Sequence, residues 1–258
     1  MLFRLNPTIK QSNALTVTIL LWLIYANNVL AEDLRWSLNV DGGAAWQSRN
    51  DVQIPNDSGT RFSLADIAGS GPLPFYRLEL NYKWKPRHGF RFLYAPFEYT
   101  KTGTLDKDVF FVDQTFNAGE PTEATYRFNS YRATYRYLWH DGKQWQWHVG
   151  FTAKIRDAEI ALKQEGKSAK DSNVGIVPLI NLYGEYAFAR RWRFIVDFDG
   201  LAAPQGRAVD LGLLVHYDVA KRWYVGGGYR TLEGGADNDE VYNFAWIHYA
   251  SISAGYRF

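Results

Sequence analysis

Charged residues two positions apart are the first side chains of this sequence that could do chemistry. Arg77 and Glu79 alternate with Tyr76, Leu78 and Leu80, so an extended chain would place both charges on one face. The same pattern recurs along the chain, at Arg77, Glu79, Arg91, Arg132, Arg136, Lys154, Arg156, Glu185, Asp197, Asp199, Asp210 and Arg230. If these faces enclose a narrow space, the charges either pair and fill it, which fixes strand register, or line a polar pore that tunes ion passage.

Acidic residues gather in the last third of the sequence. Asp197-Phe198-Asp199 presents two carboxylates to one side of a strand, as calcium sites require. A candidate cation site at one rim of the fold would consist of Asp197, Asp199, Asp210, Asp237, Asp239 and Glu240. The interpretation that we favour is instead a solvated, Gly-rich loop whose neighbouring strand-end acids pair with Arg207 and Arg230.

Nucleophilic catalysis has little support in the sequence. The chain has no cysteine, which excludes disulfides, a thiol nucleophile and a zinc-thiolate cluster. Of the five histidines, we expect His88 and His140 in turns, His148 and His216 low in the enclosed space, and His248 on the outward face. None is then placed as a base at an outer mouth. We predict no catalytic residue, no enzymatic activity and no cofactor.

The elements that must position these side chains are strands. Read at period two, the chain after residue 31 resolves into about ten segments of alternating apolar and polar residues. Their predicted ranges are 35–46, 75–84, 90–99, 124–139, 145–162, 174–188, 192–200, 208–219, 223–232 and 242–258. Pro96 predicts a bulge or an end of regular pairing in the third segment, and Gly226–Gly228 leave room for large side chains in the ninth.

Short and long connections alternate between these segments. The ranges 85–89, 140–144, 189–191 and 220–222 read as tight turns, whereas 47–74, 100–123, 163–173 and 233–241 read as long polar loops, with a shorter loop at 201–207. Tryptophans begin three segments, at Trp145, Trp192 and Trp223. Aromatic side chains at one common height suit a membrane interface.

The start of the chain predicts export. Arg4 and Lys10 precede an apolar stretch from Ala14 to about Tyr25, and Val29-Leu30-Ala31 reads as a cleavage site. We therefore predict a signal peptide over residues 1–31 and a single domain over 32–258. Residues 1–31 hold two of the 29 basic residues and none of the 27 acidic ones, so the remainder is formally neutral, and no basic stripe points to nucleic acid.

The last segment alternates as a strand up to its final residue, with Ala250, Ile252, Ala254 and Tyr256 on the face of Phe258. It resembles the signal that the outer-membrane assembly machinery reads in bacterial barrel proteins. Ser251, Tyr256 and Phe258 match its polar, aromatic and terminal-aromatic positions, while Ser253 stands where glycine is usual. Through the stretch Tyr229–Trp246, the chain also resembles an uncharacterised group of proteobacterial outer-membrane barrels, a resemblance that implies a location and a fold but no reaction.

These observations predict an all-β fold, a single antiparallel transmembrane β-barrel of about ten strands, with eight or twelve as alternatives, short periplasmic turns and long outer loops. The expected location is the outer membrane of a Gram-negative bacterium. The expected role is a non-enzymatic surface or envelope component with a charge-filled lumen. A narrow channel for ions or small solutes is the alternative, and a rim hydrolase acting on lipid or peptide comes third. Expected partners are outer-membrane lipid, lipopolysaccharide and the barrel-assembly machinery. Calcium at the outer rim, where it could bridge carboxylates to lipopolysaccharide phosphates, is a further candidate.

Overall fold

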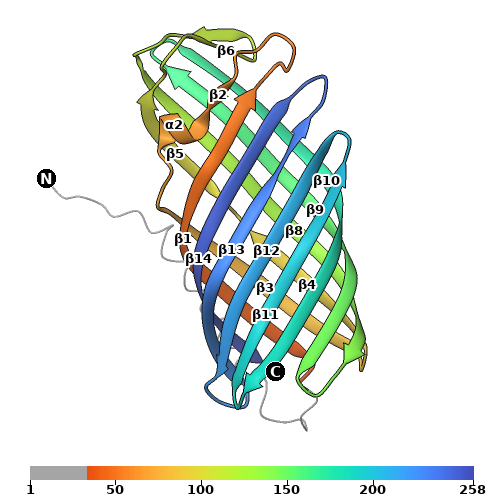
Figure 1. Cartoon of the computed structure of the whole chain (residues 1–258). Coiled ribbons are helices and arrows are strands. Elements are labelled where there is room, and N and C mark those ends of the chain that lie inside the picture. Colours follow the sequence, from red (N-terminus) through yellow and green to blue (C-terminus); the bar gives the residue numbers. More distant parts are fainter. Residues whose placement is uncertain (1–33) are drawn as a thin grey trace, which may run out of the picture. The chain divides into compact units, whose positions relative to one another are not determined.

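Ten long antiparallel strands form a closed barrel in the computed structural model, which describes residues 34–258. Residues Arg35–Arg257 make up one compact unit. Its wall consists of β1 (Trp36–Gln53), β3 (Leu73–Lys85), β4 (His88–Ala95), β8 (Pro121–Asp141), β9 (Trp145–Gln164), β10 (Lys167–Ala189), β11 (Trp192–Ala203), β12 (Gly206–Asp218), β13 (Trp223–Asp237) and β14 (Tyr242–Arg257). Pairing of β14 with β1 closes the wall (Figure 1). The prediction of about ten antiparallel strands is confirmed.

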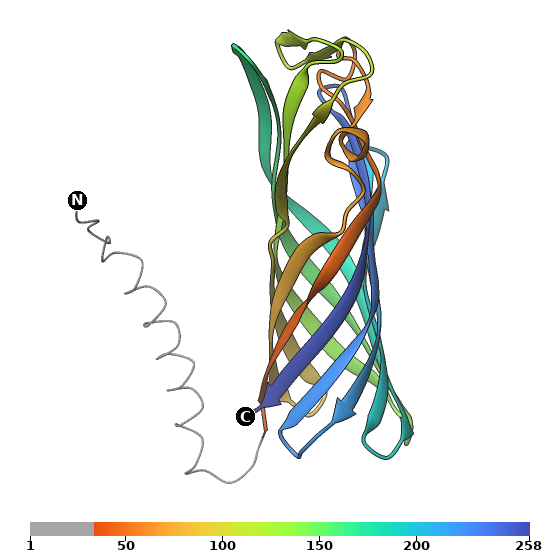
Figure 2. The same cartoon turned by 90° about the vertical axis from the view of Figure 1, so that its left-hand side faces the viewer.

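The two ends of the barrel differ in the length of the connections between strands. At the end that we call the turn end, short turns join β3 to β4, β8 to β9, β10 to β11 and β12 to β13. The opposite end, the loop end, carries β2 (Phe62–Ser63), α2 (Leu64–Ala68), β5 (Glu98–Thr104), β6 (Val109–Phe111) and β7 (Gln114–Phe116) (Figure 2). The predicted break at Pro96 is present, because β4 ends at Ala95 and β5 resumes at Glu98.

Several strands continue beyond their predicted ends. The predicted loop over residues 163–173 is wrong: β9 and β10 pair as far as Gln164 opposite Lys167, leaving a turn at Glu165 and Gly166. Likewise β13 extends to Asp237 instead of ending at Leu232. Polar residues occupy both faces of the β9–β10 extension, and the β13 extension contains mainly glycine, alanine and acidic residues, so the apolar alternation that marks the lower parts of the strands is missing.

Alternation separates two surfaces along the wall. Outward side chains such as Val149, Phe151 and Ile155 are between 41% and 56% exposed, whereas Thr152 and Lys154 on the inward face are almost fully buried. Trp84, Trp139, Trp192 and Trp223 are exposed near the turn end, as the aromatic pattern predicts. An apolar outer surface around a polar interior is the arrangement of a barrel in lipid. Among the described residues, no helix has the length and hydropathy needed to cross a bilayer.

The loop end has a hydrophobic core of its own. Leu64 and Ile67 of α2 pack with Phe111, Phe116 and other buried residues from β1, β5, β8 and β9. Ser63 caps α2 by accepting a hydrogen bond from the Asp66 backbone N–H. We call this assembly of α2, β2 and β5–β7 the cap. The segments predicted as polar loops are therefore partly folded, and they form a packed platform.

Candidate functional site

Five arginines and three aspartates meet inside the barrel. Their side chains point inward from β3, β4, β8, β11, β12 and β13, and each residue is at most 7% exposed. We call this set the charge layer; it consists of Arg77, Arg91, Arg132, Arg136, Arg230, Asp197, Asp199 and Asp210. Period-two alternation places Asp197 and Asp199 on the same face of β11, opposite the arginines of β4 and β8.

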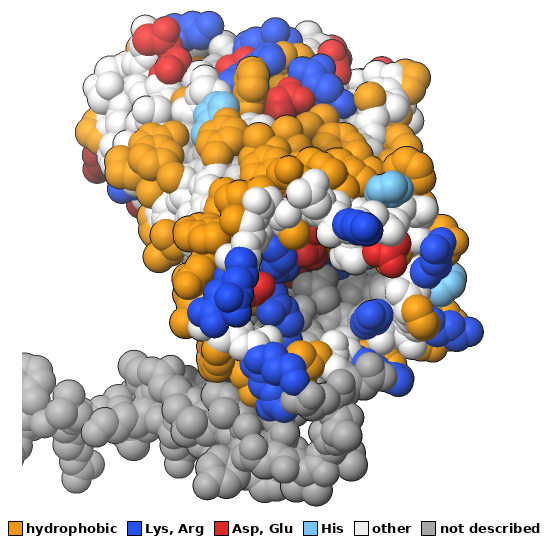
Figure 3. All heavy atoms as spheres, turned by 60° about the horizontal axis from the view of Figure 1, so that its bottom comes forward, with side chains coloured by type: hydrophobic (Ala, Val, Ile, Leu, Met, Phe, Trp, Pro, Cys, Tyr) orange, Lys and Arg blue, Asp and Glu red, His pale blue; other side chains and the backbone are white. Residues whose placement is uncertain are grey.

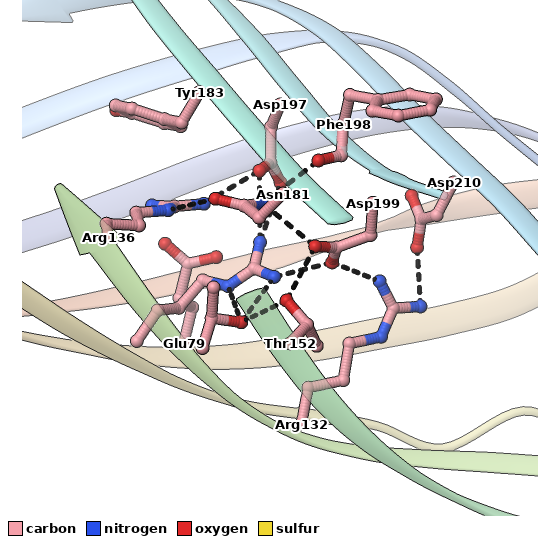
Figure 4. Close-up of polar contacts among 12 residues, drawn as sticks. Glu79, Arg132, Arg136, Thr152, Asn181, Tyr183, Asp197, Phe198, Asp199 and Asp210 are labelled. Atoms are coloured by element: carbon pink, nitrogen blue, oxygen red, sulfur yellow. Dashed lines mark hydrogen bonds and ion pairs between the residues drawn. The ribbon is translucent and has the colours of Figure 1, made fainter. Parts of the chain in front are cut away.

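Asp197 and Asp199 each bind several donors (Figure 4). Asp197 accepts hydrogen bonds from Arg91 Nη1 at 3.0 Å, Arg136 Nη2 at 2.8 Å and Arg230 Nη2 at 3.0 Å. Asp199 accepts from Arg91 and Arg132, and from two neutral donors, Thr152 and Asn181, each at 2.8 Å. An ionised carboxylate out of water is stable only with such partners.

Asp210 completes the network from β12. It accepts hydrogen bonds from Arg132 Nη2 at 2.7 Å, Arg77 Nη1 at 3.2 Å and Arg230 Nη1. Arg132 therefore bridges Asp199 and Asp210, and Arg230 bridges Asp197 and Asp210. These shared ion pairs join β3, β4, β8, β11, β12 and β13 across the lumen.

The other predicted lumen charges lie on either side of this layer. Glu185 forms an ion pair of 2.8 Å with Arg193, and Glu79 accepts a hydrogen bond from Asn81. Lys154 and Arg156 are different, because no carboxylate of the described residues lies within ion-pair distance of either. Lys154 Nζ lies 4.6 Å from the centroid of the Phe128 ring, and Arg156 donates to the neutral Asn173.

The charge layer separates two cavities. A polar cavity of about 470 Å³ at the turn end is lined by residues that include Arg136, Asp197, Arg230, His148 and His216. A second cavity of about 370 Å³ lies toward the loop end and reaches Arg132, Asp199 and Asp210 from the other side. Viewed from the turn end, lysine and arginine side chains surround a hollow, while hydrophobic side chains cover the outer wall (Figure 3). Arg91, which is 0% exposed, lies within the layer between these cavities.

The six acids of the candidate cation site do not come together. Asp197, Asp199 and Asp210 belong to the charge layer inside the lumen instead of lying at the loop-end rim, and arginines already bind their carboxylates. Asp237 ends β13 and accepts a hydrogen bond from Asn56, whereas Asp239 and Glu240 lie in the connection to β14. Within residues 34–258, no three His, Cys, Asp or Glu side chains are grouped so that they could hold a metal ion.

The favoured interpretation, in which strand-end acids pair with Arg207 and Arg230, is realised in part. Arg230 pairs with Asp197 and Asp210 as expected, while Arg207 pairs with Glu233 on the neighbouring strand. Alternation in the sequence predicts that the aspartates face inward, but it does not predict how far along the barrel axis they lie. The β11–β12 hairpin ends only a few residues beyond Asp199 and Asp210, so these strand-end acids lie inside the lumen and not at the loop-end rim.

His148 and His216 lie low in the lumen, as the sequence predicts, whereas His88 and His140 lie in strands that flank the predicted turns and not in the turns themselves. His148 and His216 line the turn-end cavity, His88 begins β4, and His140 lies next to the end of β8. His248 is on the outward face of β14, as expected, but it has a neighbour that alternation could not reveal. The Ser48 hydroxyl lies 2.9 Å from His248 Nε2, and the Tyr229 hydroxyl lies 2.6 Å from Nδ1.

A bulge brings Ser48 to this position. The register of β1 against β14 shifts between Gln47 and Arg49, so Ser48 is the extra residue, and it is exposed on the outer wall. The rings of Trp246 and Tyr229 contact the His248 ring, and Trp46 is paired with His248 across the strands; all three are about 40–45% exposed. The sequence separation of 200 residues between Ser48 and His248 explains why only barrel closure could reveal the pair.

The cap contains a buried tyrosine, Tyr99 of β5. Burial raises the pKa of Tyr99 to about 12, although hydrogen bonds with Gln47 and Asn50 act in the opposite direction. Tyr99 is therefore neutral at physiological pH, and it contributes to the packing and hydrogen bonding of the cap.

The predicted assembly segment lies in the closing strand. Ser251 is buried on the inward face and pairs with Gly43, and Tyr256 pairs with Leu38 of β1 and Trp223 of β13. β14 ends at Arg257, directly before Phe258. Recognition by assembly machinery stays a prediction, and the predicted signal peptide lies outside the described residues.

Comparisons with known proteins identify a fold. No family model matches the chain, and no curated protein sequence does so. Among solved structures, the outer-membrane protease OmpT from Escherichia coli is similar over 90% of this chain and 99% of its own, at 10% identity and a TM-score of 0.50. Ail, the attachment invasion locus protein of Yersinia pestis, matches over 87% and 99% at 11% identity and a TM-score of 0.41. Neisserial surface protein A matches over 86% and 97% at 12% identity and a TM-score of 0.38. The chain thus has the fold of a Gram-negative outer-membrane β-barrel, which by itself assigns no activity.

Proposed function

We propose that this protein is an integral outer-membrane barrel with a closed lumen that acts as a non-enzymatic surface or envelope component through its cap. The single observation that carries the proposal is the charge layer, which spans the lumen between two separate cavities. The apolar outer wall supports a membrane location, with the turn end toward the periplasm and the cap outward. Lipid and lipopolysaccharide would then surround the wall, and assembly machinery would act on β14.

The membrane location is tested by cell fractionation and gel migration. We expect the protein in the outer-membrane fraction, with a mobility that changes on boiling because the intact barrel resists unfolding by detergent. A soluble periplasmic protein without that change would contradict the proposal.

A narrow channel is the competing role for the same lumen. Liposome swelling in arabinose distinguishes the closed lumen from the channel. If the charge layer closes the lumen, liposomes that contain the protein swell at the same rate as protein-free liposomes. Faster swelling would favour the channel over the closed lumen.

A second candidate function rests on Ser48, His248 and Tyr229. A serine hydroxyl within hydrogen-bond distance of an imidazole, whose other nitrogen contacts a third group, is the arrangement of an activated nucleophile. Because Ser48 lies on the outer wall, its hydroxyl would face the ester bonds of membrane lipids. Ser48 Oγ would attack the ester carbonyl carbon while His248 Nε2 takes its proton, the alcohol would leave with that proton, and water would then hydrolyse the acyl-serine. The competing explanation is that these groups only satisfy one another's hydrogen bonds next to lipid.

A fluorophosphonate probe separates these explanations. If Ser48 is activated, the probe labels the wild type and the variant Ser251→Ala, whose altered serine is inward, but it does not label Ser48→Ala or His248→Asn. An unlabelled wild type, in a folded and heat-modifiable sample, excludes the hydrolase.

A further inference from the structure

The barrel wall is interrupted between β10 and β11 near the loop end. The two strands pair only from Ile180 opposite Gly200 down to the turn, while residues 167–179 of β10 pair with β9 alone. Pro178 stands two residues above the last pair and has no backbone N–H to donate. In Figure 2 the β9–β10 hairpin rises at one side of the loop end, above the level at which β11 and β12 turn.

The loop-end cavity lies at this interruption. Its volume is about 370 Å³, within the range of small-molecule sites. Its lining is mainly apolar and comes from both sides of the opening and from the strands opposite; it includes Tyr126, Phe128, Val177, Leu179, Leu201 and Leu232. Such a lining favours a hydrocarbon chain over a hydrophilic solute.

Apolar surface continues from the cavity to the outside of the barrel. Ile176 lines the cavity and also an outer groove that it shares with Tyr131 and Ile155. Ile176 is 78% exposed and Val174 is 70% exposed, which are high values for aliphatic side chains. An apolar chain could thus lie partly in the groove and partly in the cavity without crossing a polar barrier.

Two cations without carboxylate partners face the same cavity. Lys154 is 3% exposed, and no hydrogen bond or ion pair to it occurs in the described part of the chain, only its contact with the Phe128 ring. Arg156, two residues further along β9, has a buried Nε atom without a partner. A buried lysine is rarely found unpaired, and an unpaired cation in a cavity attracts an anion.

Carboxylates already present in the lumen do not neutralise these cations. Asp199 and Asp210 also line the cavity, but ion pairs with Arg77, Arg91, Arg132 and Arg230 occupy them. Five arginines share the three aspartates of the charge layer, so the layer has no spare negative charge for Lys154. The cavity therefore combines an apolar lining with an uncompensated positive base.

We propose that this cavity binds a single-chain anionic amphiphile, a fatty-acid-like molecule whose head contacts Lys154 and Arg156 and whose chain leaves between β10 and β11. The small volume favours one chain over the several chains of a whole membrane lipid. The inference rests on the proposed membrane location, because such a molecule reaches the opening from the lipid phase. It adds a ligand to a barrel whose lumen is closed.

Binding of labelled dodecanoate to the full chain in zwitterionic nanodiscs tests the site. We expect saturable binding to the wild type, with affinity lowered about tenfold or more in Lys154→Met, because a charge-assisted contact is lost. Lys163→Met is the matched control, since Lys163 is an exposed lysine on the same strand, and it keeps wild-type affinity. Val177→Trp fills the cavity without altering charge and also weakens binding. Heat-modifiable migration verifies that each variant is folded.

Three results would overturn the inference. The first is that the wild type and Lys154→Met bind dodecanoate with equal affinity. The second is that the wild type binds dodecyltrimethylammonium as tightly as dodecanoate. The third is that a two-chain anionic phospholipid at equal concentration displaces dodecanoate. Failure of the site is distinguishable from failure of the proposed function. A heat-modifiable outer-membrane barrel that passes no ion current and binds no dodecanoate refutes only the site, whereas a soluble protein or an open pore refutes the proposed function.

Discussion

At the scale of single residues, the decisive feature is how buried charges are partnered. Alternation in the sequence is enough to place Arg91, Arg132 and Asp197 on the inward face, but not to choose their partners. Arg91 and Asp197 are 106 residues apart, and only the curvature and register of the closed wall bring them together. The same limit hid the contact between Ser48 and His248. A residue's face is a local property, whereas its partner is a property of the whole barrel.

Removal of Arg91 should be far more costly than removal of an exposed arginine. Arg91→Met leaves Asp197 and Asp199 buried with fewer donors, so we expect the free energy of unfolding to fall by about 3–5 kcal/mol. Arg207→Met is the matched control, because the Arg207 side chain is 48% exposed and its pair with Glu233 contributes at most about 1 kcal/mol. Urea unfolding in liposomes measures both variants. Equal losses in the two would show that the charge layer does not stabilise the barrel.

Calcium should not affect stability. The acids of the candidate cation site are divided between the charge layer and the β13–β14 connection, and arginines occupy three of them. We expect the unfolding temperature to stay the same when calcium is added or chelated. A rise on adding calcium would instead point to an arrangement of Asp237, Asp239 and Glu240 that differs from the one described.

At the scale of elements, the sequence predicts the lipid-facing parts of the strands well and the loop end poorly. Period-two patterns exist where one face meets lipid and the other meets the lumen. Beyond the apolar band, as in β9 and β10 near Gln164 and Lys167, both faces are polar and the pattern ends although the strands continue. The short segments of the cap share one hydrophobic core with the wall strands, and its helix α2 is only five residues long, too short for a periodic signal.

The cap should unfold independently of the wall. Leu64 of α2 is fully buried in the cap core, so Leu64→Ala should lower local stability by about 2–5 kcal/mol. Asp66→Ala, on the exposed face of the same helix, is the control. We expect faster proteolysis between β1 and β3 in Leu64→Ala only, with heat-modifiable migration unchanged in both. Loss of that migration in Leu64→Ala would show that cap and wall form one cooperative unit.

At the scale of the whole molecule, closure and blockage are separate properties. Pairing of β1 with β14 closes the wall, and antiparallel alternation with short turns at one end predicts this from the sequence. Blockage of the lumen depends on the heights at which inward charges meet, which alternation does not specify. For this reason the sequence leaves a filled lumen and a polar pore as alternatives, while the contacts of Arg91, Arg132 and Arg230 favour the filled lumen.

The central claim is that the charge layer closes the lumen, and single-channel current recording in a planar bilayer tests it most directly. The wild type should show no steady conductance, and neither should the control Arg207→Met, whose exposed ion pair lies outside the layer. The paired variant Arg91→Ser with Asp197→Ser, which removes opposite charges together, should open a small steady current. A steady open conductance of the wild type at low voltage would contradict the closed lumen.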